Sequence, residues 1–208
     1  MSIVVEHDKR RYEILKKALD VFMDEGFENA TFQKIADKCG ITRTTLYIYF
    51  KNKKEIFIFS IKQFLQALEN DITVPMNEKG LSCTDKLIKV MTVIMESLEE
   101  NRSLLSVVID FLTYATKNNA DYDSGRRVRR RTVRMRHIQA TLLIEGKKSG
   151  EFSQNVNVKD ANELFYSILE ATVFRLVILR HPSAAEMKAA MRQAVYSLSA
   201  NQAVRLSR

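Results

Sequence analysis

A run of basic and hydroxyl side chains in the first quarter of the chain has the chemistry needed to bind nucleic acid. An arginine side chain offers two N–H groups that match the O6 and N7 atoms of guanine, and hydroxyl groups bond phosphate oxygens. Residues 31–54 hold six Lys or Arg residues and one Asp, which gives this segment a net charge of +5. The candidate DNA contacts are Thr31, Thr42, Arg43, Thr44, Thr45, Tyr47, Tyr49 and Lys53.

Two short helices separated by a tight turn are predicted to position these side chains. Thr31 suits the N-cap of a first helix, and Gly40 suits its C-terminal stop, because glycine adopts left-handed backbone angles without strain. Thr42 suits the N-cap of a second helix from Arg43 to Tyr49. The apolar positions that would lock the two helices together are Ala36, Ile41, Leu46 and Phe50. The pattern predicts a helix-turn-helix whose second helix enters the major groove of double-stranded DNA.

Residues 8–54 resemble the DNA-binding region of the TetR (tetracycline-repressor-like) family of transcription regulators. The resemblance lies in a Gly-hydrophobic-Thr turn, a Leu-Tyr pair, a Tyr-Phe ending and a Lys just beyond: Gly40-Ile41-Thr42, Leu46-Tyr47, Tyr49-Phe50 and Lys53. Ile48 departs from the family, which often has a polar residue at this position. The resemblance implies nine or ten helices, dimerisation through the last two helices, and a variable pocket for a ligand that usually releases the protein from DNA.

The rest of the chain has the pattern of an all-α protein. Only two Pro and six Gly residues interrupt 208 residues, and apolar residues recur at three- and four-residue intervals. We expect about nine helices: a three-helix DNA-binding unit in residues 1–53, then a helical ligand-binding and dimerisation domain in residues 54–208. The expected helices span residues 9–25, 32–39, 43–49, 53–71, 84–100, 104–117, 124–150, 159–180 and 184–200, with loops at 75–82 and 118–123.

The helix predicted at 159–180 is apolar on nearly every face between residues 164 and 179. Such a helix must be buried on two sides, by its own core and by a partner. The final helix adds small and flexible side chains that permit close helix contact. We therefore expect a two-fold symmetric homodimer and a pseudo-palindromic operator. The predicted interface residues are Ile168, Ala171, Thr172, Leu179, Met187, Met191, Ala194 and Leu198.

A cavity for an unknown small-molecule effector is expected among apolar side chains of the C-terminal domain. Each of these side chains has a second interpretation as plain core, because apolar stripes usually are core. Two polar members, His137 and Arg175, favour an acidic or hydrogen-bonding apolar effector, and the alternative for both is a structural role with protein partners. The candidate residues are Met91, Met95, Phe111, Tyr114, Met135, His137, Ile138, Phe165, Phe174 and Arg175.

A second basic segment needs an explanation of its own. Residues 124–150 hold nine Lys or Arg residues and one Glu, a net charge of +8. One interpretation is a solvated helix face partly paired with acids such as Glu96, Glu99 and Glu100. The alternatives are a site for an anionic ligand or partner and a further contact with nucleic acid. The arginines concerned are Arg126, Arg127, Arg129, Arg130, Arg131, Arg134 and Arg136.

Composition and motifs argue against several other classes of protein. The three histidines and two cysteines lack metal-ligand or redox spacing, and no phosphate-binding glycine loop occurs, so we expect no enzyme, metal or cofactor. No signal peptide or bilayer-spanning segment is apparent, which favours a cytoplasmic protein. The sequence therefore predicts a ligand-responsive repressor of transcription. The alternative is a helical protein-interaction module that binds nucleic acid only non-specifically.

Overall fold

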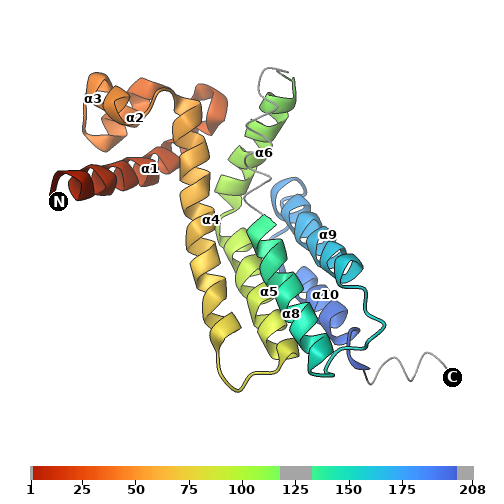
Figure 1. Ribbon diagram of the computed structural model, residues 1–208. Coiled ribbons are helices and arrows are strands. Elements are labelled where there is room, and N and C mark those ends of the chain that lie inside the picture. Colours follow the sequence, from red (N-terminus) through yellow and green to blue (C-terminus); the bar gives the residue numbers. More distant parts are fainter. Residues whose placement is uncertain (1, 118–132, 201–208) are drawn as a thin grey trace. The chain divides into compact units, whose positions relative to one another are not determined.

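The structure, a computed structural model, describes residues 2–117 and 133–200. Within these ranges the chain forms nine helices and no strand apart from an isolated bridge between Phe152 and Ser199. The all-α prediction is therefore confirmed. The helices are α1 Ser2–Asn29, α2 Phe32–Cys39, α3 Arg43–Tyr49, α4 Lys53–Asn77, α5 Cys83–Glu100, α6 Arg102–Lys117, α8 Val133–Lys148, α9 Val158–Val177 and α10 Ala185–Tyr196 (Figure 1).

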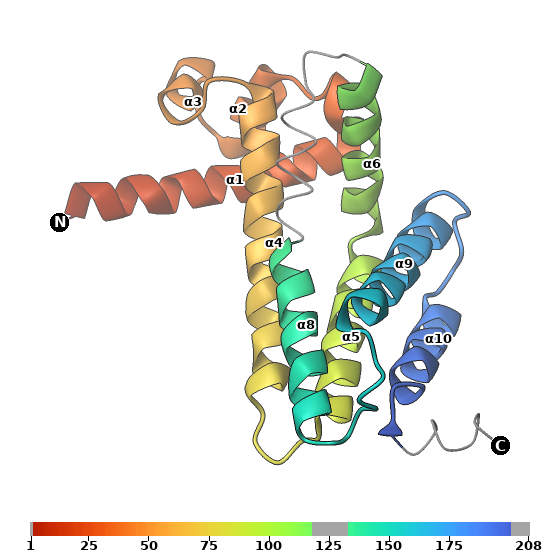
Figure 2. The ribbon, with the colours of Figure 1, turned by 45° about the vertical axis from the view of Figure 1, so that its right-hand side comes forward.

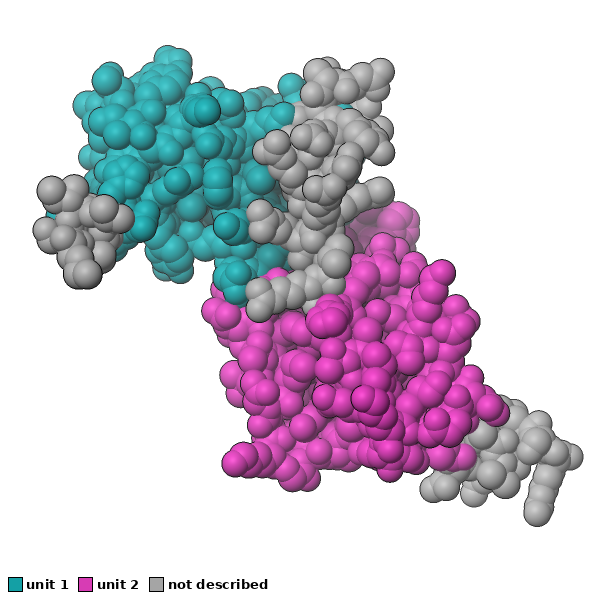
Figure 3. Space-filling model, viewed as in Figure 1, with its two compact units in different colours: residues 1–66, 103–131 teal, residues 67–102, 132–208 magenta. Residues whose placement is uncertain are grey.

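The helices gather into two compact units, which Figure 3 colours separately. The described part of unit 1 comprises residues 2–66 and 103–117, and that of unit 2 comprises residues 67–102 and 133–200. This division differs from the predicted boundary between residues 53 and 54, because the first half of α4 and most of α6 belong with the N-terminal helices. As a functional boundary, the division at residue 53 stays a prediction.

Aromatic rings from α1, α4 and α6 form the centre of unit 1. The ring centroids of Phe27 and Phe57 lie 5.2 Å apart, and both lie within 4.8 Å of the Phe111 ring. Gly26 permits this packing because its positive φ of 76° interrupts the helical path of α1 just before Phe27. The helix expected over residues 9–25 is interrupted at Gly26, but one further turn continues to Asn29.

Helices α5, α8, α9 and α10 pack against one another in unit 2 (Figure 2). Their buried positions recur at three- and four-residue intervals, so each helix presents an apolar stripe to the others. The larger buried side chains are Leu87, Val90, Met91, Ile94, Met95, Met135, Leu142, Leu143, Phe165, Leu169, Leu176, Met191 and Val195.

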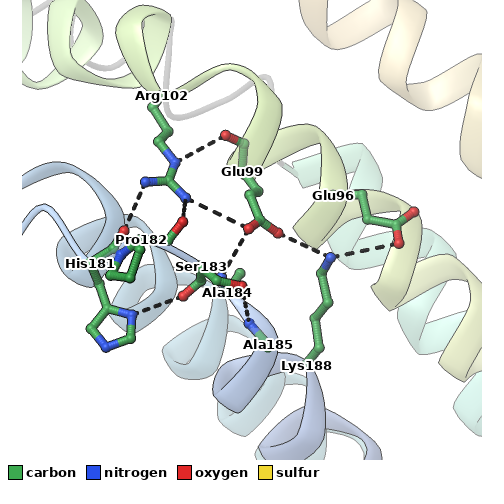
Figure 4. A network of polar contacts seen from close by, with 9 residues as sticks. All are labelled: Glu96, Glu99, Arg102, His181, Pro182, Ser183, Ala184, Ala185 and Lys188. Atoms are coloured by element: carbon green, nitrogen blue, oxygen red, sulfur yellow. Dashed lines mark hydrogen bonds and ion pairs between the residues drawn. The ribbon is translucent and has the colours of Figure 1, made fainter.

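A polar network holds the end of α5 to the segment between α9 and α10 (Figure 4). The Glu99 carboxylate accepts a hydrogen bond from the backbone N–H of Ala184 at 3.2 Å and pairs with the Lys188 ammonium at 3.1 Å. The hydrogen bond from Lys188 is the main reason that the pKa of Glu99 lies below its ordinary value. Arg102 donates to the carbonyl of His181 at 2.8 Å. These contacts fix the point at which α10 begins.

Some predicted helix ends are wrong. Helix α4 continues to Asn77, with Pro75 in its last turn, so the predicted loop at 75–82 is shorter than expected. The Pro75 carbonyl accepts a hydrogen bond from the Glu78 N–H at 3.4 Å, which closes that turn. The predicted loop at 118–123 and the predicted start of the helix at residue 124 lie outside the described residues.

Glu151 caps the N-terminus of α5 from a distant part of the chain. Its carboxylate accepts from the backbone N–H groups of Cys83 at 2.9 Å and Thr84 at 3.0 Å. Partial burial alone would raise the pKa of Glu151, but these hydrogen bonds outweigh it and lower the pKa below its ordinary value. The carboxylate thus satisfies two backbone donors that have no partner within the helix.

We expect Glu151→Gln to lower the free energy of unfolding by about 1 kcal/mol at neutral pH, because the helix N-terminus loses a charged acceptor. The folded-state pKa lies below the unfolded value, so the stabilisation is present above the ordinary glutamate pKa and is lost as the pH falls through the folded pKa. Urea denaturation at a series of pH values measures this difference. The exposed Glu145→Gln on α8 is the control, and a difference independent of pH would contradict the assignment.

Candidate DNA-binding site

The predicted capping residues form the helix-turn-helix. Thr31 Oγ1 accepts from the N–H of Lys34 at 3.2 Å before α2, and Thr42 Oγ1 accepts from the N–H of Thr45 at 3.1 Å before α3. Gly40 ends α2 with φ 68° and ψ 35°, in the left-handed region. Local hydrogen bonds therefore fix the turn between the two helices, as the sequence indicates.

Helix α3 is anchored through its inward face. Leu46 is fully buried and Phe50 is 2 % exposed, and Ile35 and Ala36 of α2 are also fully buried in the same apolar cluster. The small side chain of Ala36 lets the two helices approach each other, and they lie side by side in Figures 1 and 2. The remaining faces of α3 carry mostly polar side chains, together with the exposed Ile48.

Three of the predicted DNA contacts, Arg43, Thr44 and Tyr47, are exposed on α3. The Arg43 guanidinium donates to the Tyr47 hydroxyl at 3.2 Å and lies 5.7 Å from the centre of its ring. The Tyr47 ring in turn rests on Phe32 of α2, with the ring centroids 4.5 Å apart. The arginine is therefore supported on the surface by contacts that leave it accessible to a base or a phosphate.

Two further predicted contacts are half-buried and engaged with neighbours. The hydroxyls of Thr45 and Thr42 lie 2.8 Å apart, and the Tyr49 ring stacks on His7 of α1 at 4.7 Å. The sequence did not predict the contact between His7 and Tyr49, because nothing in the local pattern places the start of α1 beside α3. Arg11 of α1 lies over the Phe50 ring at 4.9 Å, so this cation packs against the protein.

The structure gives Lys53 a role different from the predicted phosphate contact. Its ammonium donates to three carbonyl oxygens at the end of α1, those of Phe27 at 2.9 Å, Glu28 at 2.7 Å and Ala30 at 3.0 Å. Burial lowers the pKa of Lys53, and the charge of Glu28 partly opposes that effect. A lysine ammonium has three donors, and all three are used within the protein. Lys53 thus caps the end of α1 in this structure, and its contact with a DNA phosphate stays a prediction.

The residues predicted to line the effector cavity are divided between the two units, and the cavity as a whole stays a prediction. Phe111 and Tyr114 contact the Phe27 ring in unit 1. In unit 2, His137 is exposed and Phe174 is 52 % exposed, so neither lines the interior. Arg175 is paired with Glu186 at 2.7 Å, which agrees with the alternative that Arg175 has a structural role with a protein partner. The members that lie within unit 2 and are buried or half-buried are Met91, Met95, Met135, Ile138 and Phe165.

The predicted dimer residues divide into two groups. Thr172, Met191 and Leu198 are buried within unit 2, so their assignment to a partner contact is wrong. Ala171 and Leu179 are exposed, and Ile168, Met187 and Ala194 are half-buried. Exposed apolar side chains that the prediction omitted extend the same region of α9 and α10: Leu164, Phe174, Ile178 and Tyr196.

Most of the arginine-rich segment lies outside the described residues, and Arg136 is the member whose side chain is described. Arg136 pairs with Glu163 of α9 at 2.6 Å and stacks over the Tyr166 ring at 3.6 Å. The acids expected to pair with this segment are engaged elsewhere, because Glu96 and Glu99 both bind Lys188. For Arg136, the interpretation as a paired surface cation holds, with a different partner.

Two other kinds of feature are absent from the parts of the chain that the structure describes. There, no three His, Cys, Asp or Glu side chains come together in a way that would hold a metal ion. None of the helices within residues 2–117 and 133–200 has the length and apolar character needed to cross a membrane.

A capped helix-turn-helix with an exposed Arg, Thr and Tyr face defines a DNA-binding protein of the helix-turn-helix class. Residues 14–58 match the profile of the family described as "Bacterial regulatory proteins, tetR family". Over these residues the chain is similar to the DNA-binding region of the TetR family of transcription regulators.

Relatives of known name cover most of the chain. The "Fatty acid metabolism regulator protein" of Bacillus subtilis is 26% identical over 165 residues, which are 77% of this chain and 80% of that protein. The "HTH-type transcriptional repressor KstR2" of Mycolicibacterium smegmatis is 26% identical over 79% of this chain and 76% of its own length. The crystal structure of FadR from Bacillus subtilis in complex with stearoyl-CoA superimposes with a TM-score of 0.68, at 22% identity, covering 90% of this chain and 97% of that chain.

We expect Lys53→Met to lower the free energy of unfolding by about 1.5–3 kcal/mol, because three carbonyl groups lose a charged donor. Urea denaturation measures the change, and the exposed Lys51→Met is the matched control. The salt dependence of DNA binding provides a second measurement. A lysine that contacts phosphate contributes about one ion to the salt slope. A slope reduced by one ion with unchanged stability would contradict the capping role.

Proposed function

We propose that this regulator is a homodimeric repressor that binds a pseudo-palindromic operator in the cytoplasm and is released by a hydrophobic small molecule. The observation that carries the proposal is the exposed face of α3, on which Arg43, Thr44 and Tyr47 project from a helix held by Leu46. This face has the residue types and the rigid support that recognition of base edges requires.

Each DNA contact has a proposed role. Arg43 pairs with guanine O6 and N7, and Thr44 touches a base edge or a thymine methyl group. The hydroxyl oxygen of Thr31 accepts a backbone hydrogen bond, which leaves its O–H group available to a phosphate oxygen. The Thr42 and Thr45 hydroxyls bond to each other at 2.8 Å, which leaves one O–H group of that pair for a phosphate oxygen. The hydroxyls that join them along the DNA backbone are those of Tyr47 and Tyr49.

The dimer is proposed on the exposed apolar side chains of α9 and α10. Phe174, Ile178 and Leu179 are each more than half exposed, and α9 buries its opposite face in unit 2. Large apolar side chains gathered in one region mark a protein contact. A second copy is the partner that matches a pseudo-palindromic operator, because a two-fold axis repeats the recognition helix.

The effector is proposed to be a long-chain acyl-coenzyme A. Named relatives regulate fatty acid metabolism, and FadR from Bacillus subtilis was solved with stearoyl-CoA. The core of unit 2 supports this class, because Met91, Met95 and Met135 are buried there and methionine adapts its shape to an inserted chain. An effector that binds the non-DNA-binding arrangement more tightly shifts the population toward it. One relative is named a repressor. This supports the proposal that the effector releases the protein from DNA.

Fluorescence anisotropy on DNA from upstream of the protein's own gene, with scrambled DNA as the comparison, tests the DNA-binding proposal. We expect operator binding about 10³-fold or more tighter than binding to scrambled DNA. Arg43→Ala should weaken operator binding by about 1–3 kcal/mol without changing stability, because the side chain is exposed. Stearoyl-CoA should release the operator.

The exposed Arg192→Ala on α10 controls for the loss of one positive charge. Equal, steeply salt-dependent binding to operator and scrambled DNA would overturn the proposal. The interaction module with non-specific affinity for nucleic acid would then be the better description.

Leu179→Glu should convert the dimer to a monomer and weaken operator binding. Leu179 is 60% exposed in the single chain, so the glutamate is tolerated there. In the dimer the variant would bury an unpaired charge, which costs about 3–5 kcal/mol. Analytical ultracentrifugation measures the association. Val74→Glu on α4, at a position 72% exposed and outside the proposed interface, is the matched control. An unchanged dimer would place the interface elsewhere.

A further inference from the structure

One buried polar side chain in unit 2 is not explained by the fold. Gln139 of α8 is fully buried, and neither its Nε2 nor its Oε1 has a hydrogen-bond partner. It lies within the inward stripe of α8, four residues after Met135 and three before Leu142, both of which are buried. Burying an amide without partners is unfavourable, so such groups are rare in folded proteins.

A second orphaned atom comes from the neighbouring helix. Asn162 of α9 donates through Nδ2 to the carbonyl of Arg136 at 3.0 Å, while its Oδ1 is buried without a partner. Arg136 lies one turn before Gln139 on α8, and α8 packs against α9. The two helices therefore carry one donor and two acceptors that no group within residues 2–117 and 133–200 satisfies.

The surroundings of these atoms decide which kind of group would satisfy them. Helix α5, which also packs on α8 and α9, contributes apolar side chains, among them Met91 and Met95. The nearest cation along α8 whose side chain is described, Arg136, is already paired with Glu163. A carboxylate would have to enter an apolar core without a counter-ion, which is strongly unfavourable. An uncharged carbonyl group suits an amide donor and carries no such penalty.

We infer that Gln139 recognises the effector, by donating a hydrogen bond from Nε2 to an uncharged carbonyl oxygen of an acyl chain bound within the α5–α8–α9 core. The inference rests on the proposed acyl-coenzyme A effector. It adds the residue that recognises the effector and the chemical group that this residue binds. The pantetheine arm of coenzyme A has an amide N–H two carbons beyond the thioester sulfur, and Gln139 Oε1 or Asn162 Oδ1 accepts from that group. The flexible side chains of Met91, Met95 and Met135 move to admit the apolar chain.

The test compares two probes and two proteins. Stearoyl-CoA has the thioester carbonyl, and S-octadecyl-CoA, its thioether analogue, has a CH₂ group in its place. Dissociation constants are measured by isothermal titration calorimetry for wild type and for Gln139→Met, which keeps the side-chain length and removes both polar atoms. Wild type should prefer stearoyl-CoA about tenfold, the value of one well-placed hydrogen bond, and Gln139→Met should show no preference.

Two controls separate recognition from folding. The melting temperature of Gln139→Met without effector should equal or exceed that of wild type, because the substitution removes an orphaned amide. Its operator affinity without effector should also be unchanged. His137→Ala, at an exposed position on the same helix and the other polar candidate on α8, should keep the wild-type preference for stearoyl-CoA.

The outcomes distinguish this inference from the proposed function. If wild type binds stearoyl-CoA and Gln139→Met retains the same preference over the thioether, the role of Gln139 is wrong and the acyl effector stands. If wild type binds neither probe and stearoyl-CoA does not release the operator, the acyl effector is wrong and the inference falls with it. If wild type prefers stearoyl-CoA and only Gln139→Met loses this preference, the result supports both the acyl effector and the role of Gln139.

Discussion

The contact between the Lys53 ammonium and the three carbonyl groups at the end of α1 is the constraint on which the DNA-binding unit depends. Carbonyl groups at a helix C-terminus have no partner within the helix, and here the break at Gly26 turns the chain toward α2. Lys53 is the first residue of α4, directly beyond the helix-turn-helix. One side chain therefore ties the segment that enters α2 to the segment that leaves α3, and the helix pair between them is held at both ends.

This arrangement explains how so short a recognition helix is ordered. Seven residues do not form a stable helix alone, because nucleation is costly and few hydrogen bonds follow. The order of α3 comes instead from the Thr42 cap and from the burial of Leu46 and Phe50. Stability is thus supplied by the cap and the inward face. The outward positions, such as Arg43 and Thr44, are not needed for the stability of α3. They can therefore carry side chains suited to contact with DNA.

The parts of the structure that the sequence predicted are those set by neighbouring residues. The caps at Thr31 and Thr42 and the stop at Gly40 depend on partners within four or five residues, and local rules describe them well. The carbonyl groups bound by Lys53 lie 23 to 26 residues away. The backbone groups bound by Glu151 lie 67 and 68 residues away. No periodicity marks such partners, so Lys53 resembled a cation available to DNA, and Glu151 resembled an ordinary surface acid.

Hydrophobic periodicity has a related limit, because it identifies a buried face without saying what covers it. On α9, Thr172 faces the core of its own chain while Ala171 faces outward, as does Leu179 just beyond the helix, although all three belong to one apolar segment. A buried polar residue is still harder to recognise: Gln139 reads as a surface position in a pattern of apolar and polar types. Because Gln139 lies among buried apolar side chains, its amide donor and acceptor are left without partners, and only the structure shows this. The features least visible in the sequence are therefore those set by packing between helices that are far apart along the chain.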